Sequence, residues 1–326
     1  MDSDLERLDA IARTALVHYG LDPSDELTLL NVSENATFLV RDPRRVDPTI
    51  LRLHRMNYHS REAIESELAW VEALSEADVV RTPTVITAVD GRRVVDGVHP
   101  DGESRHAVMF EFLPGIEPPE DRLVDDFHTL GAIAARMHLH ARSWTRPAGF
   151  TRFTWDFESA LGPQGRWGSW RDGMGCGPQE QQVLGRAAEL IGRRLAAYGS
   201  DSSRFGLVHA DMRLANLLLD GDDVSVIDFD DSGFSWYMYD LGSALSFIED
   251  HPQVPEMIAS WTTGYREVAS LSADDEAELE TFVMFRRLLL VAWIGSHSMT
   301  ETAQELGTPY TTVSCELAET YLSRHS

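Results

Sequence analysis

The spacing of apolar residues divides the first third of the chain between helices and strands. From Ser3 to Tyr19 apolar residues recur every three or four positions, as on one face of an amphipathic helix. A second helical stripe spans Arg61 to Ala77. Around it lie six strand-like runs, at residues 27–32, 36–41, 49–54, 84–89, 93–98 and 106–112. Asp90-Gly91, between the fourth and the fifth of these runs, is a strong hairpin turn.

From about Ile116 the apolar spacing is mostly helical. Residues 143–178 are rich in Trp, Gly and Pro, which predicts a loop region. His138 lies in a helical stretch and is expected to be packed or partnered in the core. The helices predicted for this part of the chain span residues 126–140, 179–198, 254–270 and 274–296, with a last one from about residue 310.

One short β-hairpin interrupts this helical pattern. The apolar runs Leu217–Leu219 and Val224–Ile227 flank an acidic turn, as in two strands that are joined tightly. Asn216 directly precedes the first strand, and Asp228 directly follows the second. Since Asp211 lies just before Asn216, the hairpin is predicted to bring one amide and two carboxylates to the same end.

These three side chains have the chemistry that phosphoryl transfer requires. One carboxylate must face the attacking hydroxyl group and accept its proton, while an amide oxygen and a second carboxylate hold Mg²⁺ against the nucleotide phosphates. Protein kinases supply these groups as H-x-D-x-x-x-x-N followed by D-F-x. The chain has the same spacing at His209, Asp211 and Asn216, and Asp228 begins the sequence Asp-Phe-Asp. Asp211 is therefore the candidate base, Asn216 and Asp228 are the candidate metal ligands, and Asp230 is an accessory candidate.

The stretch from His209 to Asp240 resembles the aminoglycoside phosphotransferase and choline kinase superfamily. That family carries H-x-D-x-x-x-x-N, then I-D-F/W-x-D/E, then D-L, and here the last pair is Asp240-Leu241. Within the superfamily the chain most resembles type II homoserine kinases and stress-response kinase A proteins. The resemblance implies that Asp240 has a structural role and bonds to the backbone of the catalytic loop.

The same resemblance implies an α+β, protein-kinase-like fold with two lobes. The N-terminal nucleotide-binding lobe, residues 1–114, would be a small antiparallel sheet with a helix. The C-terminal lobe, residues 115–326, would be larger and mostly helical, and would hold the catalytic and acceptor-binding residues.

The chain contains no lysine, so every basic side chain is an arginine or a histidine. This excludes a Walker A loop and a Schiff-base mechanism, since both need lysine. Kinases place a phosphate-binding cation on the third strand, and the resemblance puts Arg52 there, facing away from Leu51 and Leu53. It also assigns Glu67, on the following helix, as the partner that orients Arg52. A surface position for Arg52 is the alternative.

Four further positions are assigned to ATP by the resemblance. Ser33 and Asn35 lie in the turn that would cover the phosphates, although a plain hairpin turn favours the same residues. The backbone groups of Glu111 and Leu113 would bond to the adenine edge, because this stretch resembles the hinge between the lobes.

Length, cysteine count, apolar runs and charge indicate the number of lobes, the location and the kinds of partner. A chain of 326 residues is long enough for two lobes, and its two cysteines make neither a disulfide framework nor a zinc set. The longest apolar run, Leu288–Ile294, is too short to span a bilayer, and the polar start gives no signal peptide, so a cytoplasmic location is expected. The net charge of −25 argues against nucleic acid and membrane partners. It suits a cationic acceptor, or serves solubility alone.

The leading hypothesis is an enzyme that moves the γ-phosphate of Mg²⁺-ATP to a hydroxyl group of a small molecule, such as an aminoglycoside, an amino alcohol or a homoserine-like acceptor. A protein Ser/Thr kinase of the stress-response kinase A type is one alternative, and a nucleotide-binding regulator without turnover is another. The segment from Asp228 to Asp240 is short and carries no A-P-E sequence, so it offers little surface for a peptide. The sequence indicates neither the acceptor nor the oligomeric state.

Overall fold

The chain forms two compact units. The computed structural model describes residues 2–32, 35–221 and 223–325. The sheet unit contains residues 1–116, 145–152 and 218–230. The helical unit contains residues 117–144, 153–217 and 231–326. None of the described helices is long and apolar enough to cross a membrane.

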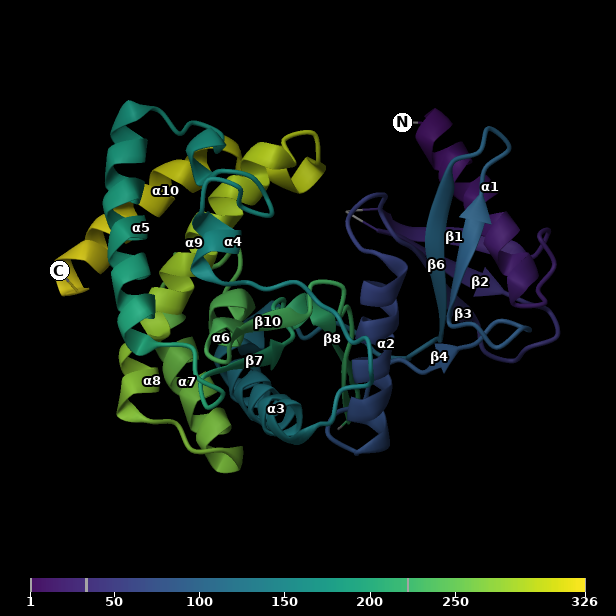
Figure 1. Cartoon of the computed structure of the whole chain (residues 1–326), viewed down its shortest axis with the longest axis horizontal. Coiled ribbons are helices and arrows are strands. Elements are labelled where there is room, and N and C mark those ends of the chain that lie inside the picture. Colours follow the sequence, from purple (N-terminus) through teal and green to yellow (C-terminus); the bar gives the residue numbers. More distant parts are fainter. Residues whose placement is uncertain (1, 33–34, 222, 326) are drawn as a thin grey trace. The chain divides into compact units, whose positions relative to one another are not determined.

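The sheet unit is built on six antiparallel strands in the order β1-β2-β3-β6-β4, with β5 also paired to β6 (Figure 1). The strands are β1 (Glu26–Val32), β2 (Ala36–Arg41), β3 (Thr49–Leu53), β4 (Val85–Ile86), β5 (Val94–Val98) and β6 (Ser104–Glu111). Its helices are α1 (Asp2–His18) and α2 (Arg61–Glu76). The sheet and both helices confirm the sequence pattern. Only β4 is clearly shorter than its apolar run. The chain reverses direction soon after this strand, and the backbone nitrogen of Ala88 donates to the oxygen of Arg92 at 2.8 Å.

Alternate residues of the central strands pack into two separate cores. On β3, Leu51 and Leu53 join the core that contains residues of α1. On β6, Val108 and Phe110 join the core that contains residues of α2. Since successive side chains of a strand point to opposite faces, Arg52 faces α2, and it pairs in register with Val108.

A second hairpin belongs to the sheet unit although it follows the predicted lobe boundary at residue 114. Strands β8 (Leu217–Asp220) and β9 (Asp223–Val226) pair with each other. The backbone nitrogen of Leu219 donates to the oxygen of Ile116 at 2.8 Å, and that of Val226 donates to the oxygen of Arg81 at 2.9 Å. These bonds join the hairpin to segments of the sheet unit.

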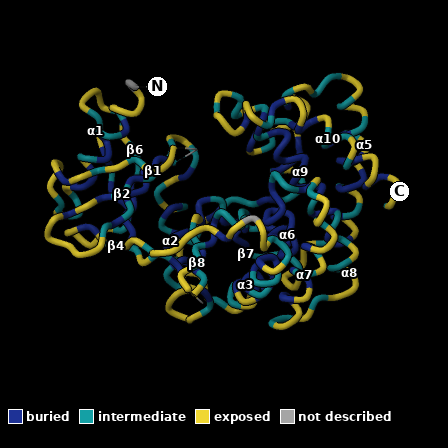
Figure 2. The backbone as a smooth tube through the Cα atoms, turned by 180° about the vertical axis from the view of Figure 1, so that it is seen from behind, coloured by how far each residue is buried: buried dark blue, intermediate teal, exposed yellow. Residues whose placement is uncertain are grey.

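The helical unit is organised around one buried helix, α9, which packs against α5, α6 and α10. Figure 2 shows α9 as mostly dark blue, and its burial explains why its sequence is the most apolar of the chain. Strands β7 (Phe205–Val208) and β10 (Gly233–Trp236) form a two-stranded antiparallel sheet in this unit. The helices are α3 (Leu123–Ser143), α4 (Phe157–Leu161), α5 (Pro178–Tyr198), α6 (Tyr239–Ala244), α7 (Val254–Val268), α8 (Ala273–Ala277), α9 (Leu279–Ser296) and α10 (Glu301–His325).

Two predicted helices differ from the structure. The single helix expected over residues 274–296 is divided into α8 and α9 at Glu278, whose φ of −102° and ψ of −1° depart from regular helical values. The last helix begins at Glu301 and not near residue 310. Gly307, with φ of +47°, interrupts it just before Pro309, so the sequence located only its second part.

Candidate active site

The loop between β7 and β8 brings Asp211 and Asn216 into contact. Asn216 ends a 3₁₀ turn, Leu214–Asn216. Its amide nitrogen donates hydrogen bonds to the backbone oxygen of Asp211 at 2.7 Å and to its Oδ2 at 2.8 Å. The five-residue spacing is therefore one turn of chain that folds the amide back onto the carboxylate.

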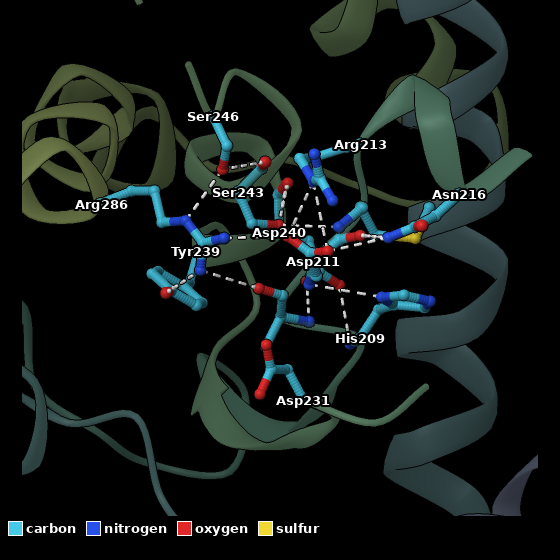
Figure 3. A network of polar contacts seen from close by, with 12 residues as sticks. His209, Asp211, Arg213, Asn216, Asp231, Tyr239, Asp240, Ser243, Ser246 and Arg286 are labelled. Carbon is cyan, nitrogen blue, oxygen red and sulfur yellow. Dashed lines mark hydrogen bonds and ion pairs between the residues drawn. The ribbon is translucent and has the colours of Figure 1, made fainter. Parts of the chain in front are cut away.

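Two arginines also hold the Asp211 carboxylate. Nη2 of Arg286 donates to Oδ1 at 2.9 Å, and Nε of Arg213 lies 3.2 Å from both oxygens. Figure 3 shows Arg286 and Asn216 approaching Asp211 from opposite sides. Burial alone would raise the pKa of Asp211, but the charges of Arg213 and Arg286 outweigh it and lower the pKa below its ordinary value. Asp211 is therefore ionised at neutral pH and able to accept a proton.

Asp240 holds the backbone of this loop, as the sequence predicted. Its Oδ1 accepts from the nitrogen of Ala210 at 2.7 Å, and its Oδ2 accepts from that of His209 at 3.2 Å. Nε2 of His138 lies 2.9 Å from Oδ2 of Asp240, and its Nδ1 lies 3.1 Å from the hydroxyl of Tyr265. His138 is fully buried, so its expected place as a partnered core residue is confirmed.

Arg286 was not among the residues that the sequence indicated. It lies in the middle of α9, next to Arg287, and both side chains are buried. Two adjacent arginines within the most apolar helix are the signal that sequence reasoning missed. Buried guanidinium groups need partners, because an unpaired buried charge is strongly unfavourable.

In the sheet unit, Arg52 and Glu67 form the predicted ion pair. Nη2 of Arg52 donates to Oε1 of Glu67 at 2.5 Å, and both side chains are buried. Nη1 of Arg52 lies 3.8 Å from Oδ1 of Asp228, and Nη1 of Arg152 lies 3.8 Å from Oε2 of Glu67. Burial would lower the pKa of Arg52, but the neighbouring carboxylates, led by Glu67, raise it above its ordinary value. Arg52 is thus a permanent buried cation, not a surface arginine.

Asp228 and Asp230 have different surroundings. The Asp228 side chain is half exposed, and its backbone has a left-handed φ of +59°, a strained conformation of the kind that clusters at functional sites. Asp230 is buried instead, with Oδ1 3.3 Å from Nδ1 of His54 and 3.5 Å from Nε2 of His59. Burial would raise the pKa of Asp230, but the two histidines lower it well below its ordinary value. This environment speaks against Asp230 as an accessory metal ligand.

Of the remaining nucleotide candidates, Asn35 directly precedes β2 and Glu111 ends β6. Ser33 lies outside the described residues. Oδ1 of Asn35 accepts a hydrogen bond from the backbone nitrogen of Arg55 at 3.0 Å. The nitrogen of Glu111, at the end of β6, donates to the oxygen of Thr84 at 2.9 Å. The contacts of adenine with the carbonyl of Glu111 and with the backbone of Leu113, which follows β6, stay predictions.

Asn216 and Asp228 have the donor atoms that a hard divalent cation prefers. The amide nitrogen of Asn216 is held by Asp211, so its Oδ1 is the atom that remains to act as a ligand. Asp228 offers a half-exposed carboxylate. Mg²⁺ binds oxygen atoms and needs only one or two protein carboxylates when nucleotide phosphates supply further ligands, so these residues fit Mg²⁺.

A family model and a known kinase each match most of the chain. The chain matches the model of the phosphotransferase enzyme family over residues 26–279. Amicoumacin kinase of Bacillus subtilis (strain 168) is 24% identical over 296 residues, which cover 86% of this chain and 83% of the relative.

Solved structures resemble the chain over nearly its whole length. The microcompartment-associated aminopropanol kinase is 50% identical with a TM-score of 0.90, covering 97% of this chain and 98% of that one. An amicoumacin kinase bound to AMP-PNP, Ca²⁺ and Ami is 20% identical with a TM-score of 0.73, covering 94% of this chain and 90% of that one. The fold is therefore protein-kinase-like, as predicted. The closer likeness to homoserine kinases stays a prediction.

Proposed function

Because the chain belongs to the phosphotransferase enzyme family, we propose that this kinase transfers the γ-phosphoryl group of Mg²⁺-ATP to the hydroxyl group of a small amino alcohol. The observation that carries the proposal is the Asp211 carboxylate, which is ionised and held by Arg286, Arg213 and Asn216. The similarity to the aminopropanol kinase, over nearly the whole of both chains, supports an amino alcohol as the acceptor.

Asp211 orients the acceptor and takes its proton. The oxygen–phosphorus bond to the acceptor forms while the bond between the γ-phosphorus and the bridging oxygen of ADP breaks, and the hydroxyl proton passes to the Asp211 carboxylate. Because the pKa of Asp211 is lowered, this proton moves late, after the hydroxyl oxygen has begun to bond to phosphorus. A weak base is sufficient for a loose transition state, because stabilising such a state depends mostly on positioning the reactants and on neutralising their charge.

Several kinds of contact are proposed for the nucleotide and its metal ion. Asn216 and Asp228 would hold Mg²⁺, which would neutralise charge on the phosphates. Arg52 binds phosphate oxygens through its fork, and Glu67 fixes the orientation of that fork. The other contacts proposed for ATP come from the backbone of Glu111 and Leu113, and from Ser33 and Asn35.

The test is ATP consumption with a panel of acceptors, using the wild-type chain and Asp211→Asn. The panel contains amino alcohols, aminoglycosides, homoserine, simple alcohols and a protein mixture. Amino alcohols are expected to accelerate ATP consumption most. Asp211→Asn is expected to lower kcat by about 100-fold or more, the usual range for loss of a general base, and to leave nucleotide affinity, measured by calorimetry, nearly unchanged.

Two outcomes would contradict the proposal. An Asp211→Asn variant that keeps most of its rate would place the base elsewhere. Efficient labelling of proteins, with no small molecule accelerating ATP consumption, would favour the protein-kinase alternative.

A further inference from the structure

Helix α9 places two consecutive arginines, Arg286 and Arg287, in the interior of the helical unit. Their partners differ. Arg287 donates to Oγ of Ser314 at 2.7 Å, to Oε2 of Glu249 at 2.7 Å and to the backbone oxygen of Tyr310 at 3.1 Å. These three bonds join α9 to α10 and to the segment after α6. Arg286, by contrast, reaches the loop that carries the candidate base.

Arg286 connects that loop to α6 and to the residues that follow it. On the anchoring side, Nε donates to Oγ of Ser246 at 2.8 Å and Nη1 donates to the hydroxyl of Tyr239 at 3.0 Å. On the loop side, Nη1 donates to the backbone oxygen of Ala210 at 3.2 Å and Nη2 donates to Oδ1 of Asp211 at 2.9 Å. Because the guanidinium group is a rigid plane, anchoring one edge fixes the edge that meets the loop.

The loop needs such support just before Asp211. Ala210 has a left-handed φ of +66°, a conformation that is strained for a residue other than glycine. Its nitrogen donates to Oδ1 of Asp240 at 2.7 Å, and its oxygen accepts from Arg286. Both polar backbone atoms of this strained residue are therefore held, one by α6 and the other by α9.

We propose that Arg286 is a positioning residue of the reaction: it fixes the backbone at Ala210 and the carboxylate of Asp211 in the orientation that an acceptor hydroxyl needs. Arg213 is less suited to this task, since its side chain is 33% exposed and comes from the loop itself. The inference rests on the proposed role of Asp211 and extends it to a residue 75 positions away in the sequence.

The test compares Arg286→Gln and Arg286→Lys with Arg287→Lys, a matched control in the same helix with similar burial. Arg286→Gln is expected to lower kcat by about 100-fold, the typical cost of misplacing a reacting group by about 1 Å, with little change in the KM for ATP. Arg286→Lys keeps the charge without the planar fork and should recover part of that loss. Arg287→Lys should keep the wild-type kcat, even where its Tm falls.

A double variant separates positioning from general loss of structure. If Arg286 acts through Asp211, adding Arg286→Gln to Asp211→Asn should lower the residual single-turnover rate little further. An additional loss as large as in the wild-type background, or a wild-type kcat in both Arg286 variants, overturns the inference. If Arg286→Gln does not fold, the lysine variants decide, and equal kcat values for Arg286→Lys and Arg287→Lys overturn it. If Asp211→Asn alone keeps its rate, the proposed function fails and this inference fails with it.

Discussion

At the scale of single residues, Arg52 offers the sharpest test of how the nucleotide is held. Arg52→Ala is expected to lower kcat/KM for ATP by about 10- to 100-fold, because a hydrogen bond to a charged group contributes about 1.5–3 kcal/mol. Arg52→Lys should restore part of the loss, since it returns the charge without the fork. The measurement is steady-state kinetics with ATP varied at saturating acceptor.

Removing Arg52 also leaves Glu67 buried without its closest partner, which lowers stability by itself. The control is Arg52→Ala combined with Glu67→Gln, in which the buried charge is gone. This double variant should recover Tm and yet remain poor in its use of ATP. Wild-type kinetics in Arg52→Ala would show that Arg52 serves the structure alone.

The same pair of residues indicates what a single sequence can predict about a site. Strand alternation placed Arg52 opposite Leu51 and Leu53, but periodicity could not choose Glu67 among the glutamates of α2, and the family resemblance made that choice. The ion pair confirms it. Arg286 could not be found in this way, because its contact with Asp211 joins residues that no local pattern relates.

At the scale of elements, two glycines determine how closely α3 and α7 pack. A Cβ atom added at Gly131 would lie 2.0 Å from the backbone oxygen of Trp261, and one added at Gly264 would lie 1.9 Å from that of His128. Neither distance is tolerable against backbone, so Gly131→Ala must push the helices apart. Overpacking of this kind typically costs about 1–3 kcal/mol. We expect Tm to fall by several degrees in thermal unfolding followed by circular dichroism.

The control for that variant is Gly185→Ala, also in a helix interior. A Cβ atom at Gly185 would meet only Trp170, at an ordinary 3.7 Å. Alanine is favoured over glycine within a helix by about 1 kcal/mol, so this variant should keep or raise Tm. An equal Tm for Gly131→Ala and the wild type would mean that α3 and α7 are not packed this closely in solution.

Helices were predicted well where one apolar spacing continued over many residues. Element boundaries were missed where no glycine, proline or clear change of spacing marked them. The long stripes of α2, α3 and α5 were found nearly to their ends. The division between α8 and α9 was missed, since the single residue Glu278 separates them and the sequence there carries no breaking signal such as Gly or Pro. Strand β10 was also missed, because its four residues, Gly233–Trp236, are too few for alternation to stand out. Its pairing with β7 is a long-range contact.

At the scale of the whole molecule, charge is the property that the sequence gives without any structure. The chain has 53 acidic residues against 28 basic ones, a formal net charge of −25. A surface with such an excess carries a negative potential of several kT, which raises the local concentration of cations. The described cations nearest the candidate chemistry, Arg52, Arg213 and Arg286, are each paired with a carboxylate, so they do little to reduce that potential outside.

This charge predicts how the acceptor should respond to salt. Screening acts over about 10 Å at 0.1 M ionic strength, so added salt should weaken the attraction between the protein and an ammonium group. For an amino alcohol, KM is expected to rise by up to about tenfold between low and high ionic strength, in line with surface potentials of this size.

The matched control is the same compound without its amino group. Its KM, or its inhibition constant where it does not react, should hardly change. Kinetics are measured at saturating Mg²⁺-ATP, with sodium chloride setting the ionic strength. Equal responses of the charged and neutral compounds would mean that the acidic surface serves solubility and takes no part in attracting the acceptor.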